Sequence, residues 1–562
     1  MTAGSPLARL APWVLGVIAT AFALIGSWRA SPTDDEPTYV GQGAYILTHG
    51  DFRAPVLLWQ PPLALYVQSA GLAFADTNPA AWERAHSVDS LTDLGDALIF
   101  ESPSPPETVL LASRLPIALA TGVLTALAAI LAGRLAGKTA SVLAGLLVGA
   151  SPVVYGHGGL ATTDLVATLG ALAATAGLVA LVLAPDASTS RRRGLAAGAL
   201  LGLALLAKHT SIPLAALAAA LAFVVARRHG LARGAALGRA AALLGVAAAV
   251  VWAGYGFDVG RLVDAGSSGD LLDKLAGSLP LPRAFVESVG HDVPLPAPRW
   301  FQSLAFQAAK QHGRLYFRYF DDTAKTGWWT YFPVVTLGKL TLGSLGLVAA
   351  GALTLRRRRP SPEEWVLLLA FALPFGAAVV SRHNLGVRHV IPALVPLFAL
   401  VAVRIGRATQ AAPRGALFLA AAGLACVHAG EGLLACGNPV AWWNLAYGGT
   451  RGGWHVTAGS NADWGQGLWE LRDLVRREGL EHVHLIAAGP ASAVEHLGEP
   501  RIEPMPHFWW KEPLPSQGWL AVSTSATWID GKVPVTDAPP DRFVAGCYRL
   551  YRLPLPAEGS HR

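Results

Sequence analysis

The chain has 562 residues, of which 52% are hydrophobic and only 14% are charged, and its mean hydropathy is +0.41. Soluble domains carry about 25% charged residues, so the composition excludes an ordinary soluble protein and predicts a membrane protein. The net charge of +7 does not indicate a nucleic-acid partner, because the basic residues form short clusters between apolar runs, as topology signals do. No disulfide framework is expected from the three cysteines, Cys426, Cys436 and Cys547.

The first apolar run opens near Leu10 and closes near Trp28. No small-residue cleavage site follows it, so we interpret it as a retained transmembrane helix. With a span length of about 20 residues, about eleven transmembrane helices are predicted. They cover residues 10–29, 112–134, 138–156, 162–184, 194–209, 211–226, 236–256, 331–355, 363–381, 389–404 and 415–436.

Basic loops set the predicted orientation. When the spans are counted in order, all of these loops fall on one side: Arg134–Lys138, Arg191–Arg193, Arg227–Arg239, Arg356–Arg359 and Arg404–Arg414. Cytoplasmic loops carry an excess of Lys and Arg, so we expect a multi-pass protein of the cytoplasmic membrane with a cytoplasmic N-terminus. The predicted parts are a membrane module, 1–436, with long exterior loops at 30–111 and 257–330, and an exterior domain, 437–562.

The first exterior loop contains PPLALYVQSAGLAFA, which is too short to span and predicts an interfacial helix. In the tail, LWELRDLVRREG is typical of an amphipathic helix that ends at a glycine. HVHLIAAG, GWLAVSTSATW and RFVAGCYRLYRL predict strands. The predicted fold class is therefore an all-α polytopic membrane protein with a small C-terminal α/β domain.

Acidic residues stand at the exterior ends of two spans. Asp34, Asp35 and Glu36 follow the first span in SPTDDEPTYV, and His157 and Asp164 lie in SPVVYGHGGLATTD between the third and fourth. Charges at membrane depth are costly, so each is a functional candidate. The alternative interpretation is a solvated turn at the first site and, at the second, a carboxylate stabilised by a helix N-terminus. A helix-stabilising Asp164 is compatible with a catalytic one.

Cations stand at the same ends of the spans. LLAKHTS joins the fifth and sixth spans, and SRHNLGVRHVIP, which also contains Arg382 and His383, joins the ninth and tenth. A lysine whose head reaches the interface is the simpler explanation of Lys208. Such cations also bind phosphate through charge-assisted hydrogen bonds. The candidates for phosphate binding are Lys208, Arg388, His389, Lys339 and Arg114.

Together these groups indicate transfer chemistry at a lipid phosphate. A carboxylate acts as a general base toward a hydroxyl or amine, cations stabilise a departing phosphate, and grooves between helices hold a lipid tail. A transporter would more often place its charges near the bilayer midplane. A transporter or flippase of lipid-linked sugars and a non-catalytic membrane assembly protein stay as alternatives.

The succession of motifs resembles a known family. The Asp-Glu pair is followed by Tyr39 and GDFRAPVLLWQPPLALY, and then by SPVVYGHGGLATTD, LAKHT, YFPVVTLGKL, NLGVRHVIP, WWNLAYGG and SNADWGQGL. In this order they resemble the GT-C glycosyltransferases, specifically the group of protein O-mannosyltransferases and lipid A aminoarabinose transferases. The resemblance covers most of the chain, although the segment 71–108 looks like an insertion in the first loop.

The resemblance implies an inverting glycosyltransferase that moves a sugar from a polyprenyl-phosphate donor to a protein, lipid or glycan acceptor. It implies Asp35 as the catalytic base, with Glu36 beside it, and Asp164 as a second functional acid. Asp34 competes with Asp35 for the role of base. Some relatives use a divalent metal ion and others do not, so metal dependence is left open, with Asp35, Asp164 and His157 as candidate ligands.

Overall fold

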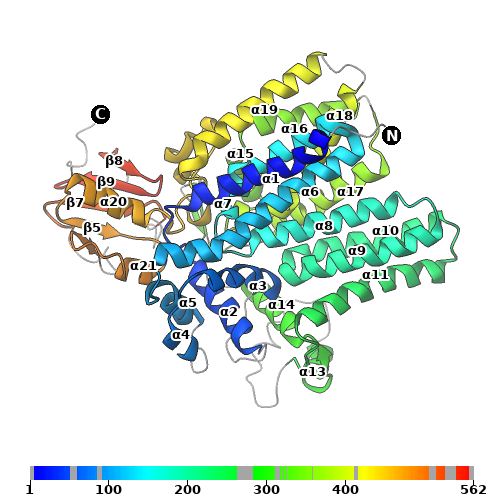
Figure 1. Cartoon of the computed structure of the whole chain (residues 1–562), viewed down its shortest axis with the longest axis horizontal. Helices are drawn as coiled ribbons and strands as arrows, with labels where there is room; N and C mark the ends of the chain where they lie inside the picture. Colours follow the sequence, from blue (N-terminus) through cyan, green and yellow to red (C-terminus); the bar gives the residue numbers. More distant parts are fainter. Residues whose placement is uncertain are drawn as a thin grey trace.

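The computed structural model shows a long helical bundle with a small sheet at one end (Figure 1). It describes residues 6–50, 60–84, 91–262, 283–310, 317–320, 322–324, 326–356, 358–381, 383–410, 415–505, 514–525 and 539–555. Most of GDFRAPVLLWQ, residues 51–59, and Arg382 lie outside the described residues.

Apolar helices build the bundle. Within the described residues, eight helices are long and apolar enough to cross a membrane, or nine if one bent pair counts as a single span. The bundle helices are α1 (Pro6–Ser27), α6 (Pro106–Gly149), α8 (Asp164–Val182), α9 (Ala187–Ala207), α10 (Ile212–Arg228), α11 (Arg233–Gly254), α15 (Tyr331–Lys339), α16 (Leu342–Leu353), α17 (Pro362–Val380), α18 (Ile391–Thr409) and α19 (Ala416–Leu434). Ten of the eleven predicted runs each overlap one of these helices, and the run 331–355 overlaps two, α15 and α16.

Helix α6 accounts for two predicted spans because it folds back on itself. Its 44 residues are interrupted at Ala136 and Gly137, whose backbone angles are not helical. A Cβ added at Gly133 would lie 2.9 Å from the Cβ of Ser141, and one added at Gly145 would lie 3.3 Å from that of Ala129. The two halves therefore pack antiparallel, and Gly137, with φ of +80°, supplies the left-handed residue that the reversal needs.

The eighth predicted span, 331–355, is not a straight helix. Helices α15 and α16 meet at 112°. Leu340 between them is extended, and Thr341 begins the second helix by accepting a hydrogen bond from the Ser344 amide at 3.0 Å. A side-chain cap of this kind favours a new helix start over continuation. The prediction of one continuous span was wrong here.

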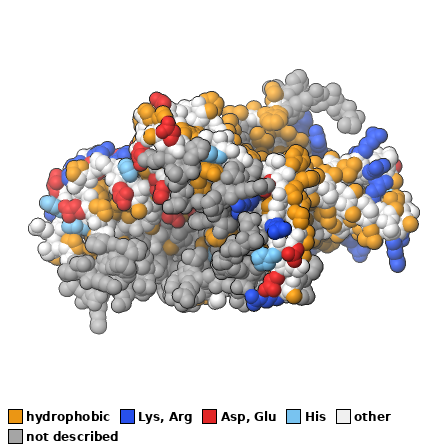
Figure 2. Space-filling view, turned by 90° about the horizontal axis from the view of Figure 1, so that it is seen from below, with side chains coloured by type: hydrophobic (Ala, Val, Ile, Leu, Met, Phe, Trp, Pro, Cys, Tyr) orange, Lys and Arg blue, Asp and Glu red, His pale blue; other side chains and the backbone are white. Residues whose placement is uncertain are grey.

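The two ends of the bundle differ in charge. The five basic loops join helices at one end, and Figure 2 shows Lys and Arg side chains gathered at the end away from the C-terminal sheet. Large apolar side chains on the flanks are exposed, among them Val17 at 70% and Leu419 at 62%. This pattern agrees with a helical membrane protein, and its orientation toward the cytoplasm stays a prediction.

The segments of the first predicted loop fold into short helices beside the bundle. They are α2 (Glu36–His49), α3 (Pro62–Ala70) followed by η1 (Gly71–Phe74), α4 (Pro79–Arg84) and α5 (Leu91–Phe100). The apolar stretch predicted as a helix is α3 with η1. Helices α2 and α5 approach closely at two glycines. A Cβ added at Gly41 would lie 1.8 Å from the carbonyl oxygen of Leu91, and one added at Gly95 would lie 1.8 Å from that of Pro37.

The second predicted loop supplies two further helices near the bundle. These are α13 (Arg283–Asp292) and α14 (Pro298–Lys310). Short antiparallel pairs accompany them, β1 (Val259–Gly260) with β2 (Leu295–Pro296) and β3 (Phe317–Tyr319) with β4 (Asp322–Ala324).

The tail forms the small α/β unit that the sequence predicts. Helix α20 (Leu468–Glu478) ends at Gly479, which is left-handed with φ of +63°. The sheet has the order β6-β5-β7-β9-β8; β5 is parallel to β6 and β7, and β9 is antiparallel to β7 and β8. The strands are β5 (Val483–Ile486), β6 (Ile502–Pro504), β7 (Trp519–Ser523), β8 (Arg542–Val544) and β9 (Tyr548–Arg552). The short helix α21 (Ala491–Glu495) lies between β5 and β6 in the chain. One hydrophobic core joins α20 and this sheet to α2 and α5.

Between α19 and α20 the chain packs against the bundle as a series of 3-10 turns, anchored by Lys339. The Lys339 ammonium donates to the carbonyl oxygens of Val440 at 2.7 Å, Trp442 at 2.8 Å and Asn461. An ammonium has three N–H donors, so this side chain, which is 2% exposed, has no donor left for a phosphate. Its contacts argue against the predicted phosphate-binding role and indicate a structural one.

We expect Lys339→Met to destabilise the protein. The substitution removes the ammonium donor from the buried carbonyl oxygens of Val440 and Trp442, and a buried acceptor left without a partner costs about 1–3 kcal/mol. The apparent melting temperature in detergent should fall, and the segment around Val440 should become more sensitive to protease. Lys138→Met, at an exposed position of the opposite end, is the matched control. An unchanged melting temperature for Lys339→Met would contradict the anchoring role.

Candidate active site

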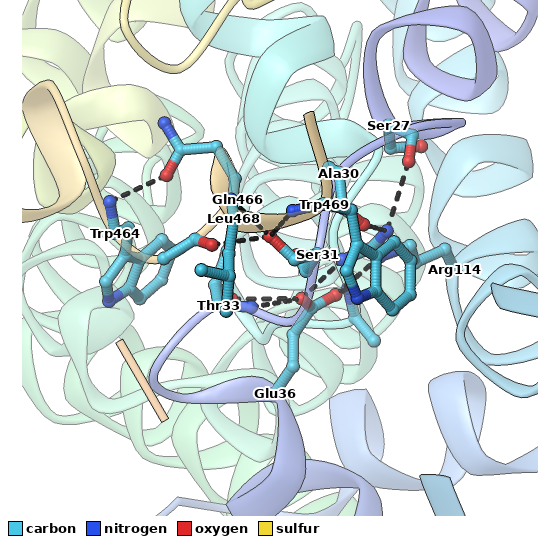
Figure 3. A network of polar contacts seen from close by, with 12 residues as sticks. Ser27, Ala30, Ser31, Thr33, Glu36, Arg114, Trp464, Gln466, Leu468 and Trp469 are labelled. Atoms are coloured by element: carbon cyan, nitrogen blue, oxygen red, sulfur yellow. Dashed lines mark hydrogen bonds and ion pairs between the residues drawn. The ribbon is translucent and has the colours of Figure 1, made fainter. Parts of the chain in front are cut away.

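Glu36 and Arg114 form a buried ion pair at the start of α2 (Figure 3). Arg114 Nε donates to Glu36 Oε1 at 2.8 Å, and Nη2 donates to Oε2 at 2.7 Å. Glu36 also accepts from the backbone amides of Thr33 at 2.8 Å and Ala161 at 2.7 Å. Burial alone would raise the pKa of Glu36, but Arg114 and these amides outweigh it and lower the pKa below its usual range.

The remaining donors of Arg114 bind the backbone that leaves α1. Nη1 donates to the carbonyl oxygens of Ser27 at 3.1 Å and Ala30 at 2.7 Å, and Nη2 to that of Ser31 at 3.0 Å. The side chains of Arg114 and Glu36 are 2% and 0% exposed. The geometry therefore argues against the phosphate-binding role predicted for Arg114 and the catalytic role predicted for Glu36, and indicates that the pair holds the backbone in place.

The same turn binds the segment that precedes α20 (Figure 3). Ser31 Oγ donates to the Gly465 carbonyl at 2.6 Å and accepts from the Leu468 amide at 2.9 Å. The Asp34 amide donates to the Trp464 carbonyl at 3.0 Å. These bonds join residues more than 400 positions apart, and they place Trp464 beside the acidic turn.

Asp35 differs from its neighbours because its side chain faces a cavity. It is 24% exposed, and its Oδ2 lies 2.6 Å from Nη1 of Arg388. The hydroxyl of Tyr39, one helical turn later, donates to the same oxygen at 3.5 Å. Asp34 is exposed and does not line this cavity. Of the two aspartates, only Asp35 is placed for chemistry there.

Arg388 is positioned by the tail. The preceding Gly386 has φ of +127°, and a Cβ there would lie 2.2 Å from Ser460 Oγ, so only glycine fits this approach. The guanidinium of Arg388 lies over the ring of Trp464, with its Cζ 4.0 Å from the ring centroid. An arginine stacked on an indole has a fixed plane while its N–H edge stays available.

The cavity has a volume of about 530 Å³ and is lined by both polar and apolar side chains. Asp35, Tyr39, Lys208, Arg388 and His389 line its polar part, together with Gln60, Gln307 and His383. Its apolar lining comes from α10, α14, α15, α17 and α18 and from the segment before α18, and it includes Ile212, Pro213, Leu304, Phe332, Pro374, Ala377, Ala378, Leu385 and Pro392. A charged head with an apolar body matches these surfaces.

Asp164 binds Lys208, which lines the cavity. Its Oδ1 lies 2.6 Å from the Lys208 ammonium, and Thr162 donates to its Oδ2 at 3.4 Å. Asp164 is 2% exposed and is not among the residues that line the cavity. An ammonium has three donors, and Lys208 reaches the cavity while one of them binds Asp164. These contacts favour Asp164 as a residue that positions Lys208.

The predicted metal ligands do not form a ligand set. Within the described ranges, no three His, Cys, Asp or Glu side chains gather so that they could hold a metal ion. The carboxylates of Asp35 and Asp164 bind Arg388 and Lys208 instead. His157 is packed near Trp464, with ring centroids 6.1 Å apart, and burial lowers its pKa to about 3. These residues therefore do not fit a metal site.

The structure thus brings together four of the predicted groups in one cavity: Asp35, Lys208, Arg388 and His389. Sequence reasoning missed Tyr39 and Trp464 as members of the site, although both stand inside the motifs quoted above. It also missed α14 as part of the apolar wall. The amphipathic pattern of that helix predicts that its apolar face is buried, but it does not predict which other helices that face contacts.

Removing one partner of the Glu36–Arg114 pair should destabilise the protein. Arg114→Met leaves a buried carboxylate without its cation, which typically costs about 3–5 kcal/mol. We expect a large drop in the apparent melting temperature in detergent, and a smaller additional drop when Glu36→Gln is combined with it. Arg472→Met, which breaks an exposed pair with Glu107, should change the melting temperature little. Comparable effects of Arg114→Met and Arg472→Met would contradict the structural role.

The pair should also contribute a pH-dependent part of the stability. Because the folded-state pKa of Glu36 lies below the ordinary value of 4.5, its stabilisation is complete above that value and is lost as the pH falls through the folded pKa. The stability advantage of the wild type over Glu36→Gln should therefore shrink on acidification. Melting curves of both proteins at neutral pH and below about pH 4 test this, and a constant difference would contradict it.

Comparison with known proteins agrees with the motif resemblance. A family model described as dolichyl-phosphate-mannose-protein mannosyltransferase matches residues 107–252. No curated protein matches the chain significantly.

Three solved structures are similar over most of this chain. ArnT from Cupriavidus metallidurans bound to undecaprenyl phosphate is 14% identical with a TM-score of 0.48, and the match covers 98% of both chains. The same protein in the apo state is 13% identical with a TM-score of 0.49, over 96% of both chains. The oligosaccharyltransferase AglB from Archaeoglobus fulgidus, in complex with an inhibitory peptide and a dolichol-phosphate, is 11% identical with a TM-score of 0.43, over 95% of this chain and 72% of that chain.

The matched segment contains Arg114, Asp164 and Lys208 and ends near the end of α11. Over residues 107–252 the chain is therefore similar to the dolichyl-phosphate-mannose-protein mannosyltransferases, the group that its motifs resemble.

Proposed function

We propose that the protein is an inverting glycosyltransferase that moves a sugar from a polyprenyl-phosphate donor to an acceptor at the outer face of the cytoplasmic membrane. The observation that carries this proposal is the composition of one cavity. A partly exposed carboxylate, Asp35, is paired with Arg388 and lines one cavity together with Lys208 and apolar side chains from several helices. A polyprenyl phosphate has the matching parts, an anionic head and an apolar chain.

The proposed reaction is a single displacement. Asp35 accepts the proton of the acceptor hydroxyl or amine as that atom forms a bond to the anomeric carbon. The bond between this carbon and the phosphate oxygen breaks, and its electron pair leaves with the phosphate. Lys208 and Arg388 stabilise the charge that develops there. Attack from the side opposite the leaving group inverts the anomeric centre.

The match to the mannosyltransferase family over residues 107–252 supports this proposal. The position of the charges supports it further, because the cavity lies at the end of the bundle opposite the basic loops. If the basic loops face the cytoplasm, the cavity opens toward the outer face. A transporter would more often place such groups near the middle of the bundle.

Asp35→Asn should abolish most transfer. Loss of a positioned general base typically lowers the rate about 100-fold or more. The measurement is formation of labelled product from a polyprenyl-phosphate sugar by the protein in proteoliposomes, with lipid or glycoprotein acceptors from the cell envelope. Asp34→Asn is the matched control, because it removes the same charge at the exposed neighbouring position, and it should stay within about threefold of the wild type.

Two results would contradict the assignment. Wild-type rates for Asp35→Asn would exclude this residue as the base. Relocation of the labelled lipid across the bilayer without any new glycosidic bond would favour a flippase over a transferase.

A further inference from the structure

The proposed base is already paired in this structure. Arg388 Nη1 lies 2.6 Å from Asp35 Oδ2, and the two side chains are 9% and 24% exposed. A carboxylate oxygen that accepts a charge-assisted hydrogen bond from a guanidinium is a poor proton acceptor, because protonation would cost the ion pair. With this pair intact, Oδ2 of Asp35 is occupied by Arg388.

Arg388 has binding capacity that the protein does not use. A guanidinium has five N–H donors, and Nε of Arg388 is buried without an acceptor among the described residues. Its face rests on Trp464, so its edge can change partners while its plane is retained. The residue lines the same cavity as Lys208. Phosphate oxygens bind such an edge in a bidentate manner.

A phosphate between Lys208 and Arg388 would therefore compete with Asp35 for the guanidinium. We propose that donor binding releases the base: the donor phosphate takes over Arg388 from Asp35, and the freed carboxylate then accepts the proton of the acceptor. This inference rests on the proposed function. In this exchange Trp464 is a positioning residue, because it supports Arg388. Asp35 becomes a base only when the donor site is occupied, so the empty site activates neither water nor the acceptor.

Other charges facing the pair are consistent with this exchange. Asp164 is held by Lys208 at 2.6 Å, and Glu36 is held by Arg114 at 2.7 Å, so both have cationic partners of their own. Tyr39 already donates to Asp35, and its hydroxyl can keep the freed carboxylate in position. Asp34 is exposed to solvent and makes no ion pair with Arg388 within the described residues, but its carboxylate lies close enough for electrostatic interactions with both Asp35 and Arg388.

The exchange predicts that removing the competitor strengthens phosphate binding. The probe is a short-chain polyprenyl phosphate without sugar, which binds but undergoes no transfer, titrated into the full-length protein in detergent. We expect Asp35→Asn to bind it about tenfold more tightly than the wild type, the scale of one charge-assisted hydrogen bond. Asp34→Asn removes an equal charge one residue away and should change the affinity less than about twofold.

A variant of Arg388 tests whether the tighter probe binding of Asp35→Asn depends on this arginine. In Arg388→Gln the probe should bind more weakly, and adding Asp35→Asn should then bring little gain. Arg388→Lys serves as a further variant that keeps the positive charge while losing the bidentate edge. In that background too, the gain from Asp35→Asn should be smaller than in the wild type.

The outcomes separate the two proposals. Equal affinities of wild type and Asp35→Asn, or equal gains for Asp35→Asn and Asp34→Asn, would overturn the exchange and leave the transferase proposal standing. Failure of the wild-type protein to bind any polyprenyl phosphate would overturn the donor class and, with it, the proposed function. An undiminished gain in the Arg388→Gln background would overturn the role of Arg388.

Discussion

The buried pair of Glu36 and Arg114 is the constraint on which the site depends. A charge at this depth is tolerated only with a partner and a complete set of hydrogen bonds, and both residues have them. Arg114 binds the last turn of α1 and the turn after it, while Glu36 fixes the first turn of α2. The pair therefore sets the path of the chain through the acidic turn, and the neighbouring carboxylates have little freedom in where they point.

This constraint separates three adjacent acids that look alike. With Glu36 turned inward to Arg114, Asp35 faces the cavity and Asp34 faces solvent. The tail then completes the site, because Trp464 is held by the same turn and supports Arg388. The polar lining of the cavity is thus assembled from parts of the chain separated by hundreds of residues. The C-terminal part of the chain therefore contributes Trp464 to the site and also forms the five-stranded sheet.

The buried cations divide according to their hydrogen bonds. Arg114 and Lys339 satisfy all their donors with protein oxygens. Arg388 and Lys208 instead line a cavity, and among the described residues Nε of Arg388 has no acceptor. All four are charged residues in or beside apolar segments, so a sequence marks all of them as candidates. Their roles differ because the surrounding backbone carbonyls come from distant positions.

The sequence by itself determined the helical membrane architecture, the charge difference between the two ends of the bundle, and the α/β tail, because periodicity, apolar length and basic loops are local properties. It also identified Asp35, Lys208, Arg388 and His389 as candidates. Only the tertiary structure decided that α6 folds back, that the span 331–355 bends, and that Glu36, Arg114 and Lys339 are buried and hydrogen-bonded to other parts of the protein. It also decided that Asp35 is paired with Arg388 on Trp464. The physical reason is that burial and hydrogen-bond partners depend on which distant segments pack together.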